Sequence, residues 1–104
     1  MTGQKPSIVS GTPPARFLED AKRDRFWVYG ASPEGETVWD VDLTGDVILC
    51  LGAEGPGLRR LTRETCDRLV SIPMVEGAGS MNVGVSAAVL LFEALRQRRA
   101  RRPA

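Results

Sequence analysis

The sequence predicts an α/β fold with a mainly parallel sheet flanked by helices. Apolar runs typical of strands alternate along the chain with segments of helical periodicity, and this order favours the α/β class. The strongest run, residues 46–51 (DVILCL), is apolar almost throughout, which is typical of a strand covered on both faces. With 104 residues, the chain is long enough for one small domain with a core of limited size.

Before this strongest strand, the pattern predicts a helix and a second strand. Thr12 precedes two prolines, which is typical of a helix start, and an aromatic and β-branched run ends at Gly30. The opening residues fit either a short strand or a leader outside the fold. The expected elements are this undecided segment at 1–12, a helix from 13 to 23, a strand at 26–29, and a connection at 31–45 with one helical turn at 38–41.

The second half is predicted to hold two helices and one more strand. Pro73 stops the short strand, and Ser80 and Asn82 are both good caps for the last helix. The expected elements are the strand at 46–51, a glycine-rich loop at 52–57, a helix over 58–69, a strand at 70–72, a loop at 74–81, and a helix from 82 or 83 to 99. The last helix has apolar residues at steps of three and four: Val83, Ala87, Leu90, Leu91, Ala94 and Leu95.

The use of histidine and cysteine limits the possible chemistry. The chain has no histidine, which excludes Ser-His-Asp and Cys-His nucleophile systems within it and any zinc site with a histidine ligand. Cys50 and Cys66 lie in apolar segments without redox or metal spacing, so we interpret them as buried thiols in a reducing compartment. The sequence shows neither a membrane-length apolar stretch nor a signal-peptide core. We therefore expect a cytoplasmic protein with no membrane partner and no metal.

Positive charge is concentrated at the end of the chain. The net charge is +1, yet five arginines lie within residues 96–102. The rest of the chain has nine basic residues against 13 acidic ones, a net charge of −4. This tail is either an electrostatic contact for a polyanion or a solvated helix end.

A glycine-rich loop follows the strongest strand. Gly52, Gly55 and Gly57 would let a ligand approach the backbone closely at the edge of a parallel sheet, or would simply make a tight strand-to-helix turn. The loop lacks the lysine of a Walker phosphate loop and the spacing of a dinucleotide fingerprint. Glu54 would repel a phosphate, so this position favours a neutral or cationic ligand.

A second candidate segment combines apolar and small polar residues. Ile72, Met74 and Met81 accompany Ser80 and Asn82 near the start of the last helix. Apolar walls with a few polar groups suit a flat heteroaromatic ring. The same residues also fit a helix cap with ordinary core packing.

Taken together, the two segments resemble a known family. Residues 51–58 (LGAEGPGL), 71–74 (SIPM) and 79–83 (GSMNV) are similar to motifs two and three of the SPOUT superfamily, in its SpoU (TrmH) class of RNA 2′-O-ribose methyltransferases. Residues 60–67 (RLTRETCD) and 91–97 (LFEALRQ) resemble the RlmB branch, which methylates a guanosine ribose in large-subunit ribosomal RNA. The resemblance is strong over 46–98 and fainter over 14–30.

The resemblance implies a C-terminal trefoil knot, S-adenosyl-L-methionine as cofactor, ribosomal RNA as substrate and a homodimer in which the last helix packs. The implied cofactor-binding residues are Leu51, Gly52, Gly57, Ile72, Met74 and Met81. The implied residues at the methyl-transfer site are Glu54, Ser80 and Asn82, and the implied RNA contacts are Arg59 and Arg60.

One family motif is not found in this sequence. Members of the class carry a first motif with an asparagine and an arginine that helps to deprotonate the ribose hydroxyl. We therefore expect an N-terminally truncated, C-terminal part of the methyltransferase domain at 13–99, followed by a basic tail at 100–104. Such a chain is expected to bind the cofactor weakly and to transfer methyl groups slowly or not at all. The alternatives are a non-catalytic RNA-binding or dimerisation fragment and, less compatible with Glu54, a nucleotide-binding α/β protein.

Overall fold

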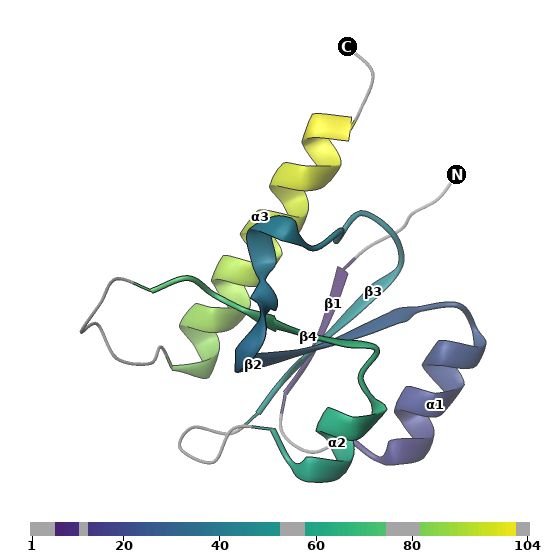
Figure 1. Cartoon of the computed structure of the whole chain (residues 1–104). Helices are drawn as coiled ribbons and strands as arrows, with labels where there is room; N and C mark the ends of the chain where they lie inside the picture. The colour runs from purple at the N-terminus through teal and green to yellow at the C-terminus, as the bar shows by residue number, and fades with distance from the viewer. Residues whose placement is uncertain (1–5, 11–12, 53–57, 75–81, 102–104) are drawn as a thin grey trace.

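The computed structural model describes residues 6–10, 13–52, 58–74 and 82–101 of the chain. Strands and helices alternate along these residues, as the sequence predicts (Figure 1). The elements are β1 (Pro6–Ser10), α1 (Ala15–Arg23), β2 (Trp27–Thr37), the short 3-10 helix η1 (Val38–Asp40), β3 (Val47–Leu51), α2 (Arg60–Thr65), β4 (Arg68–Ser71) and α3 (Val83–Arg101).

The four described strands form one sheet in the order β1-β3-β2-β4. Every pairing between them is parallel, so the predicted parallel sheet is confirmed. Register is regular in the centre, where Gly30 of β2 is paired with Cys50 of β3. β2 lies between β3 and β4, so the end of β2 separates the end of β3 from the end of β4.

Helices and connections cover both faces of the sheet (Figure 1). On one face, α3 and the segment 38–43 enclose the larger core cluster: Tyr29, Val38, Val41, Leu43, Val47, Leu49, Leu51, Val70, Leu90 and Ala94. On the other face, α1 and the residues around α2 enclose the smaller cluster: Leu18, Ala21, Val28, Ile48 and Cys50. All five residues of β3 are buried, which confirms that the apolar run is covered on both sides.

Long-range contacts fix the start of β4. Asp67 accepts a hydrogen bond from the backbone N–H of Val28 at 2.8 Å, and its own N–H donates to the Val28 carbonyl at 2.7 Å. Lys22 of α1 forms an ion pair with the same carboxylate at 3.5 Å. These contacts draw the end of α2 toward β2, so that the next residues join the sheet.

Several predicted boundaries are wrong. The helix expected over 58–69 is confined to α2, and Leu69 lies in β4 instead. The strand expected at 26–29 extends to Thr37, because Gly35 lets β2 approach the backbone of β4 closely. Pro14 is the N-cap of α1 rather than a residue of its first turn, and Thr12 lies outside the described residues. Within the undecided segment 1–12, Pro6–Ser10 form the strand β1.

The last helix begins where the sequence predicts, at Val83. Its buried contacts come from Leu90 and Ala94, which are fully enclosed. Phe92 and Leu95 of the same helix are 71% and 61% exposed, so its apolar residues are divided between the core and the surface. Across the described residues, no helix is long and apolar enough to cross a membrane.

Candidate cofactor site at the carboxyl edge of the sheet

The predicted cofactor segments begin where two parallel strands end. Leu51 is the last residue of β3, and Ile72 directly follows β4. Parallel strands place their carboxyl ends at one edge of a sheet, where α/β proteins commonly bind ligands. The two segments are therefore at the same edge, on either side of β2.

Apolar packing brings these segments toward the start of α3. Leu51 is 3% exposed and belongs to the larger core cluster. Ile72, Val83 and Ala87 are partly buried and pack against the same cluster. Met74 is 41% exposed and Gly52 is partly exposed, so both are accessible near the ends of β4 and β3. This edge thus offers an apolar surface with exposed backbone nearby.

Asn82 caps the final helix. Its side-chain oxygen accepts a hydrogen bond from the Val85 N–H at 2.8 Å, and its carbonyl accepts one from the Ser86 N–H at 3.0 Å. The capping role weighed from the sequence is therefore observed. Asn82 itself is exposed, and its side-chain nitrogen carries two further donors.

Four of the predicted site residues cannot be placed. Glu54, Gly57, Ser80 and Met81 lie outside the described residues, so their predicted roles stay predictions.

The end of β2 is a part of this edge that sequence reasoning missed. Ala31 packs against the larger core cluster, and Ser32 is buried, with its hydroxyl accepting a hydrogen bond from the Glu34 N–H. A Cβ on Gly35 would lie 2.4 Å from the Leu69 carbonyl carbon, so glycine is required for this approach to β4. The only sequence signal was the glycine and proline content of the segment, which had favoured a loop.

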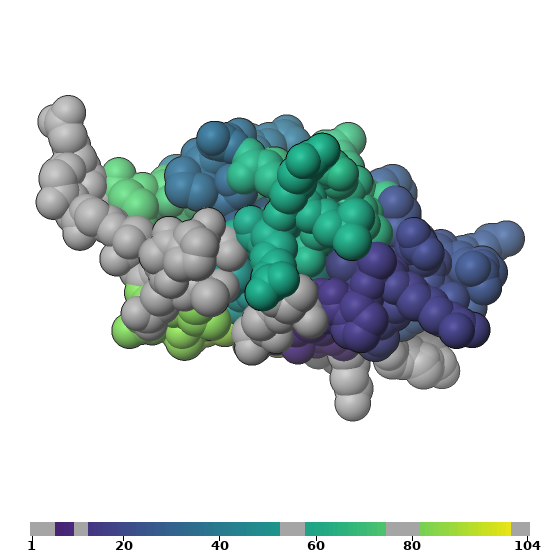
Figure 2. All heavy atoms as spheres, turned by 90° about the horizontal axis from the view of Figure 1, so that it is seen from below, coloured from purple at the N-terminus to yellow at the C-terminus, as the bar shows by residue number. Residues whose placement is uncertain are grey.

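Ion pairs surround the edge near α2, which lies in the middle of the face shown in Figure 2. Glu34 pairs with Arg63, and Glu36 pairs with Arg68 at 3.1 Å. Of the predicted RNA contacts, Arg59 is exposed, whereas Arg60 donates to Glu64 at 3.0 Å. That pair is itself highly exposed, so Arg60 can exchange its partner at small cost.

Part of the arginine-rich segment 96–102 is engaged within the fold. Arg96 forms two hydrogen bonds with Glu93 at 2.9 Å, and Arg98 donates to the carbonyls of Leu43 and Gly45. The bond from Arg96 is the main reason why the pKa of Glu93 is lowered from its usual value. Arg99 is exposed. Arg98 therefore holds α3 to the fold, and Arg96 is paired within α3. Among the described arginines of this segment, the predicted polyanion contact then falls mainly to Arg99.

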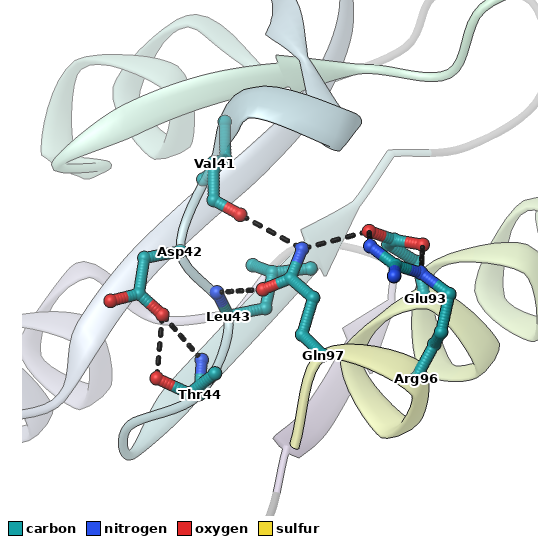
Figure 3. Close-up of polar contacts among 7 residues, drawn as sticks. All are labelled: Val41, Asp42, Leu43, Thr44, Glu93, Arg96 and Gln97. Atoms are coloured by element: carbon teal, nitrogen blue, oxygen red, sulfur yellow. Dashed lines mark hydrogen bonds and ion pairs between the residues drawn. The ribbon is translucent and has the colours of Figure 1, made fainter. Parts of the chain in front are cut away.

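A shallow hollow among the described residues lies away from the candidate site. Its volume is about 360 Å³, and it lies between η1 and the end of α3, where Trp39, Asp40, Arg96 and Gln97 contribute to its walls. Figure 3 shows that Gln97 and Arg96 are bonded to neighbouring groups there. Among the described residues, no group of three or more acidic or cysteine side chains is arranged to hold a metal ion.

Comparison with known proteins identifies the family. The model of the SpoU rRNA methylase family matches residues 4–92. The chain belongs to this family. A 23S rRNA (guanosine-2′-O-)-methyltransferase RlmB from Pseudomonas syringae is 50% identical over 96 residues, which is 91% of this chain and 38% of the relative. The corresponding protein of Xanthomonas campestris is 52% identical over 92 residues, covering 88% of this chain and 37% of the relative. The chain thus spans less than two fifths of the length of these curated relatives.

Solved structures of the family share the fold. The SpoU methyltransferase AviRb from Streptomyces viridochromogenes, solved with the cofactor AdoMet, superimposes with a TM-score of 0.77 and 33% identity, covering 86% of this chain and 36% of AviRb. A TrmH/SpoU tRNA-modifying enzyme from A. aeolicus gives a TM-score of 0.76 at 32% identity, covering 85% of this chain and 46% of the enzyme.

The described residues fit S-adenosylmethionine. An adenine ring needs apolar walls and a few backbone donors and acceptors. Ile72 and Met74 supply accessible apolar surface at the same edge as the buried Leu51, and the backbone leaves the sheet at Gly52 and Ile72. The family resemblance and this edge of the sheet therefore point to the same cofactor.

Proposed function

We propose that this chain acts in an S-adenosylmethionine-dependent RNA methyltransferase that modifies the ribose 2′-hydroxyl of a guanosine in large-subunit ribosomal RNA. The observation that carries the proposal is the match to the SpoU family across residues 4–92. It is supported by the two cofactor segments, which leave the same edge of a parallel sheet. RlmB relatives at about 50% identity favour ribosomal RNA over other RNAs.

Three described residues would hold the adenosine of the cofactor. Leu51 and Ile72 would contact the ring, and Met74 would cover it from the solvent side. Backbone at Gly52 would provide hydrogen bonds without a side chain in the way. Gly57 and Met81 would complete the pocket, with the segment after β4 threaded through a trefoil knot.

The bound cofactor supplies an electrophilic methyl group. The protein then has to align the ribose oxygen with that methyl and remove the hydroxyl proton, because a neutral hydroxyl is a poor nucleophile. Ser80 and Asn82 would orient the hydroxyl, and Glu54 would be the carboxylate available to accept the proton.

The capping bond of Asn82 supports its proposed role. With its oxygen engaged by the Val85 N–H, the side chain is held at the first turn of α3, and its amide nitrogen keeps both donors for a substrate oxygen. A fixed donor costs no reordering when the substrate binds. Asn82 would therefore be both a helix cap and a substrate contact.

RNA and a second copy of the chain are the proposed partners, in the cytoplasm. Arg59 and Arg60 would contact phosphates, which makes RNA affinity decrease with salt. Exposed Phe92 and Leu95 on α3 would be covered in a homodimer.

A methyl-transfer assay tests the proposed function. The chain is incubated with cofactor labelled in its methyl group and with 23S rRNA, and the RNA is then hydrolysed in alkali. A 2′-O-methyl group protects the adjacent phosphodiester, so we expect label in alkali-resistant dinucleotides, formed slowly. Label at the level of a protein-free control, from a chain that binds the cofactor, would replace the proposal by the non-catalytic alternative.

Two substitutions at one position separate capping from catalysis. Asn82→Ala removes the cap and the amide donors, whereas Asn82→Asp keeps an oxygen for the Val85 N–H but has no amide. We expect the aspartate variant to keep the wild-type Tm and to lose transfer. If it transferred methyl groups at the wild-type rate, Asn82 would be a cap alone.

A further inference from the structure

The two thiols of the chain meet on one face of the sheet. Cys50 is 1% exposed, lies in β3, and belongs to the smaller core cluster. Cys66 directly follows α2 and is partly exposed, with its side chain packed against the same cluster. Neither thiol has a role in the proposed methyl transfer.

A glycine in the neighbouring strand makes room for the second thiol. Gly30 of β2 is paired with Cys50 of β3, so a side chain at residue 30 would lie beside that of Cys50. A Cβ built there would be 2.8 Å from the Cys66 sulfur and 2.7 Å from Leu58. The Cys66 sulfur thus occupies the space over Gly30 that a larger residue would fill, next to the side chain of Cys50.

The two thiols influence each other's ionisation. A hydrogen bond from Cys66 lowers the pKa of Cys50, against the opposing effect of burial. The same contact, followed by burial, raises the pKa of Cys66. In the neutral pair, the one thiol hydrogen of Cys66 is donated to the Thr62 carbonyl at 3.2 Å, and it turns to Cys50 when that thiol ionises. The pair therefore loses its first proton at a lower pH than an isolated buried thiol would, and the two sulfurs share the proton that remains.

We propose that Cys50 and Cys66 form a reversible intramolecular disulfide, and that a peroxide is the oxidant. The pair loses one proton, and when the remaining proton lies on Cys50 the partly exposed sulfur of Cys66 attacks hydrogen peroxide as a thiolate. The O–O bond breaks, a sulfenic acid forms, and the hydroxide that leaves takes up the released proton as one water. The sulfur of Cys50 then attacks that of Cys66, the S–O bond breaks, and a second water leaves. Two thiols and one peroxide thus give one disulfide and two waters; sulfur is oxidised and peroxide oxygen is reduced.

The disulfide would restrain the connection between β3 and α2. It would join the end of β3 to the end of α2, across the segment that begins at Leu51 and Gly52. It would therefore restrain the unit on which the proposed cofactor site depends, although the disulfide itself does not require the proposed function. A disulfide that closes such a loop raises the free energy of unfolding, because it reduces the conformational entropy of the unfolded chain.

Peptide mapping of the oxidised chain tests the proposal. The folded chain is treated with hydrogen peroxide, free thiols are blocked, and the protein is digested with trypsin without reduction. Cleavage after arginine places Cys50 in peptide 26–59 and Cys66 in peptide 64–68. We expect these two peptides to be joined, with the intact mass lower by two hydrogens and restored by a thiol reductant. Oxygen adducts on separate peptides, disulfides between chains, or unreacted thiols would overturn the proposal.

A matched pair of glycine variants tests the geometry. Gly30→Ala places a Cβ against the Cys66 sulfur, whereas Gly45→Ala meets no atom within 4 Å. We expect Gly30→Ala to form the disulfide at least about tenfold more slowly, because the sulfurs lose their alignment, and Gly45→Ala to match the wild type. Equal rates in all three folded proteins would contradict the proposal.

If Gly30→Ala does not fold, the proposal is tested on the wild type, by comparing the rate of disulfide formation in the folded chain with the rate in urea. The pair should react faster in the folded chain than in the unfolded chain, since the fold brings the sulfurs together. A faster reaction in the unfolded chain would show that the fold opposes the disulfide, and would overturn the proposal.

Discussion

Gln97 joins α3 to the connection between β2 and β3, and its removal gives a prediction with a defined magnitude. Its amide nitrogen donates to the Val41 carbonyl at 3.0 Å and to Glu93 at 2.8 Å, and its oxygen accepts from the Leu43 N–H at 2.7 Å (Figure 3). Gln97→Ala removes all three bonds and leaves partly buried backbone groups without these partners. The change should therefore destabilise the whole domain.

The expected loss follows from the number of bonds. Each intramolecular hydrogen bond contributes about 1 kcal/mol net, and alanine regains part of this through its higher helix propensity. We expect the free energy of unfolding to fall by about 2 to 3 kcal/mol. A domain of this size has a total stability of about 5 to 15 kcal/mol, so the loss is a large share.

Urea unfolding, followed by tryptophan fluorescence, measures the effect. Arg99→Ala, at an exposed position of the same helix, is the matched control and should change the stability by less than about 0.5 kcal/mol. Gln97→Glu adds a pH test, because its carboxylate can still accept from Leu43 but faces Glu93. The free energy of unfolding of Gln97→Glu should be lower than that of the wild type, and this difference should become smaller as the pH falls and the new carboxyl is protonated. A loss below about 0.5 kcal/mol for Gln97→Ala would refute the assigned role.

Three further predictions concern the core, a close approach and an ion pair. Leu90→Ala should lower the free energy of unfolding by about 2 to 5 kcal/mol in a urea titration, since Leu90 is fully buried. Gly35→Ala should lower Tm far more than Gly45→Ala, because only the first new Cβ meets the backbone of β4; similar Tm values would contradict the close approach. The lowered pKa of Glu93, caused mainly by Arg96, means that the pair stabilises the folded chain above pH 4.5 and that this contribution is lost as the pH falls toward the lower folded-state pKa. Glu93→Gln should therefore show a weaker loss of stability on acidification than the wild type, and an unchanged pH profile would exclude this source of pH dependence.

The parts of the fold that depend on local pattern were predictable from the sequence. The apolar run of β3 indicates a strand buried on both faces, because each of its side chains needs a covered environment. The start of α3 was predictable because Asn82 is a good cap and the apolar spacing follows. The family motifs likewise lie at strand ends, where a local sequence is sufficient to recognise them.

The parts that depend on distant residues were not predictable. Leu69 fits a helical spacing, but the bonds between Asp67 and Val28 draw the following residues into the sheet. The length of β2 depends on the approach of Gly35 to β4, which no local pattern reveals. The meeting of two cysteines over Gly30 likewise requires the strand register.

The central claim is that the carboxyl edge of β3 and β4 binds S-adenosylmethionine, and a calorimetric titration of the chain tests it most directly. We predict saturable binding with about one site per chain. Met74→Asp, at an exposed position two residues after Ile72, should fold and lose this binding, whereas Glu19→Ala on the exposed side of α1 should keep it. A folded chain that takes up no cofactor, or a Met74→Asp variant that binds it as the wild type does, would contradict the claim.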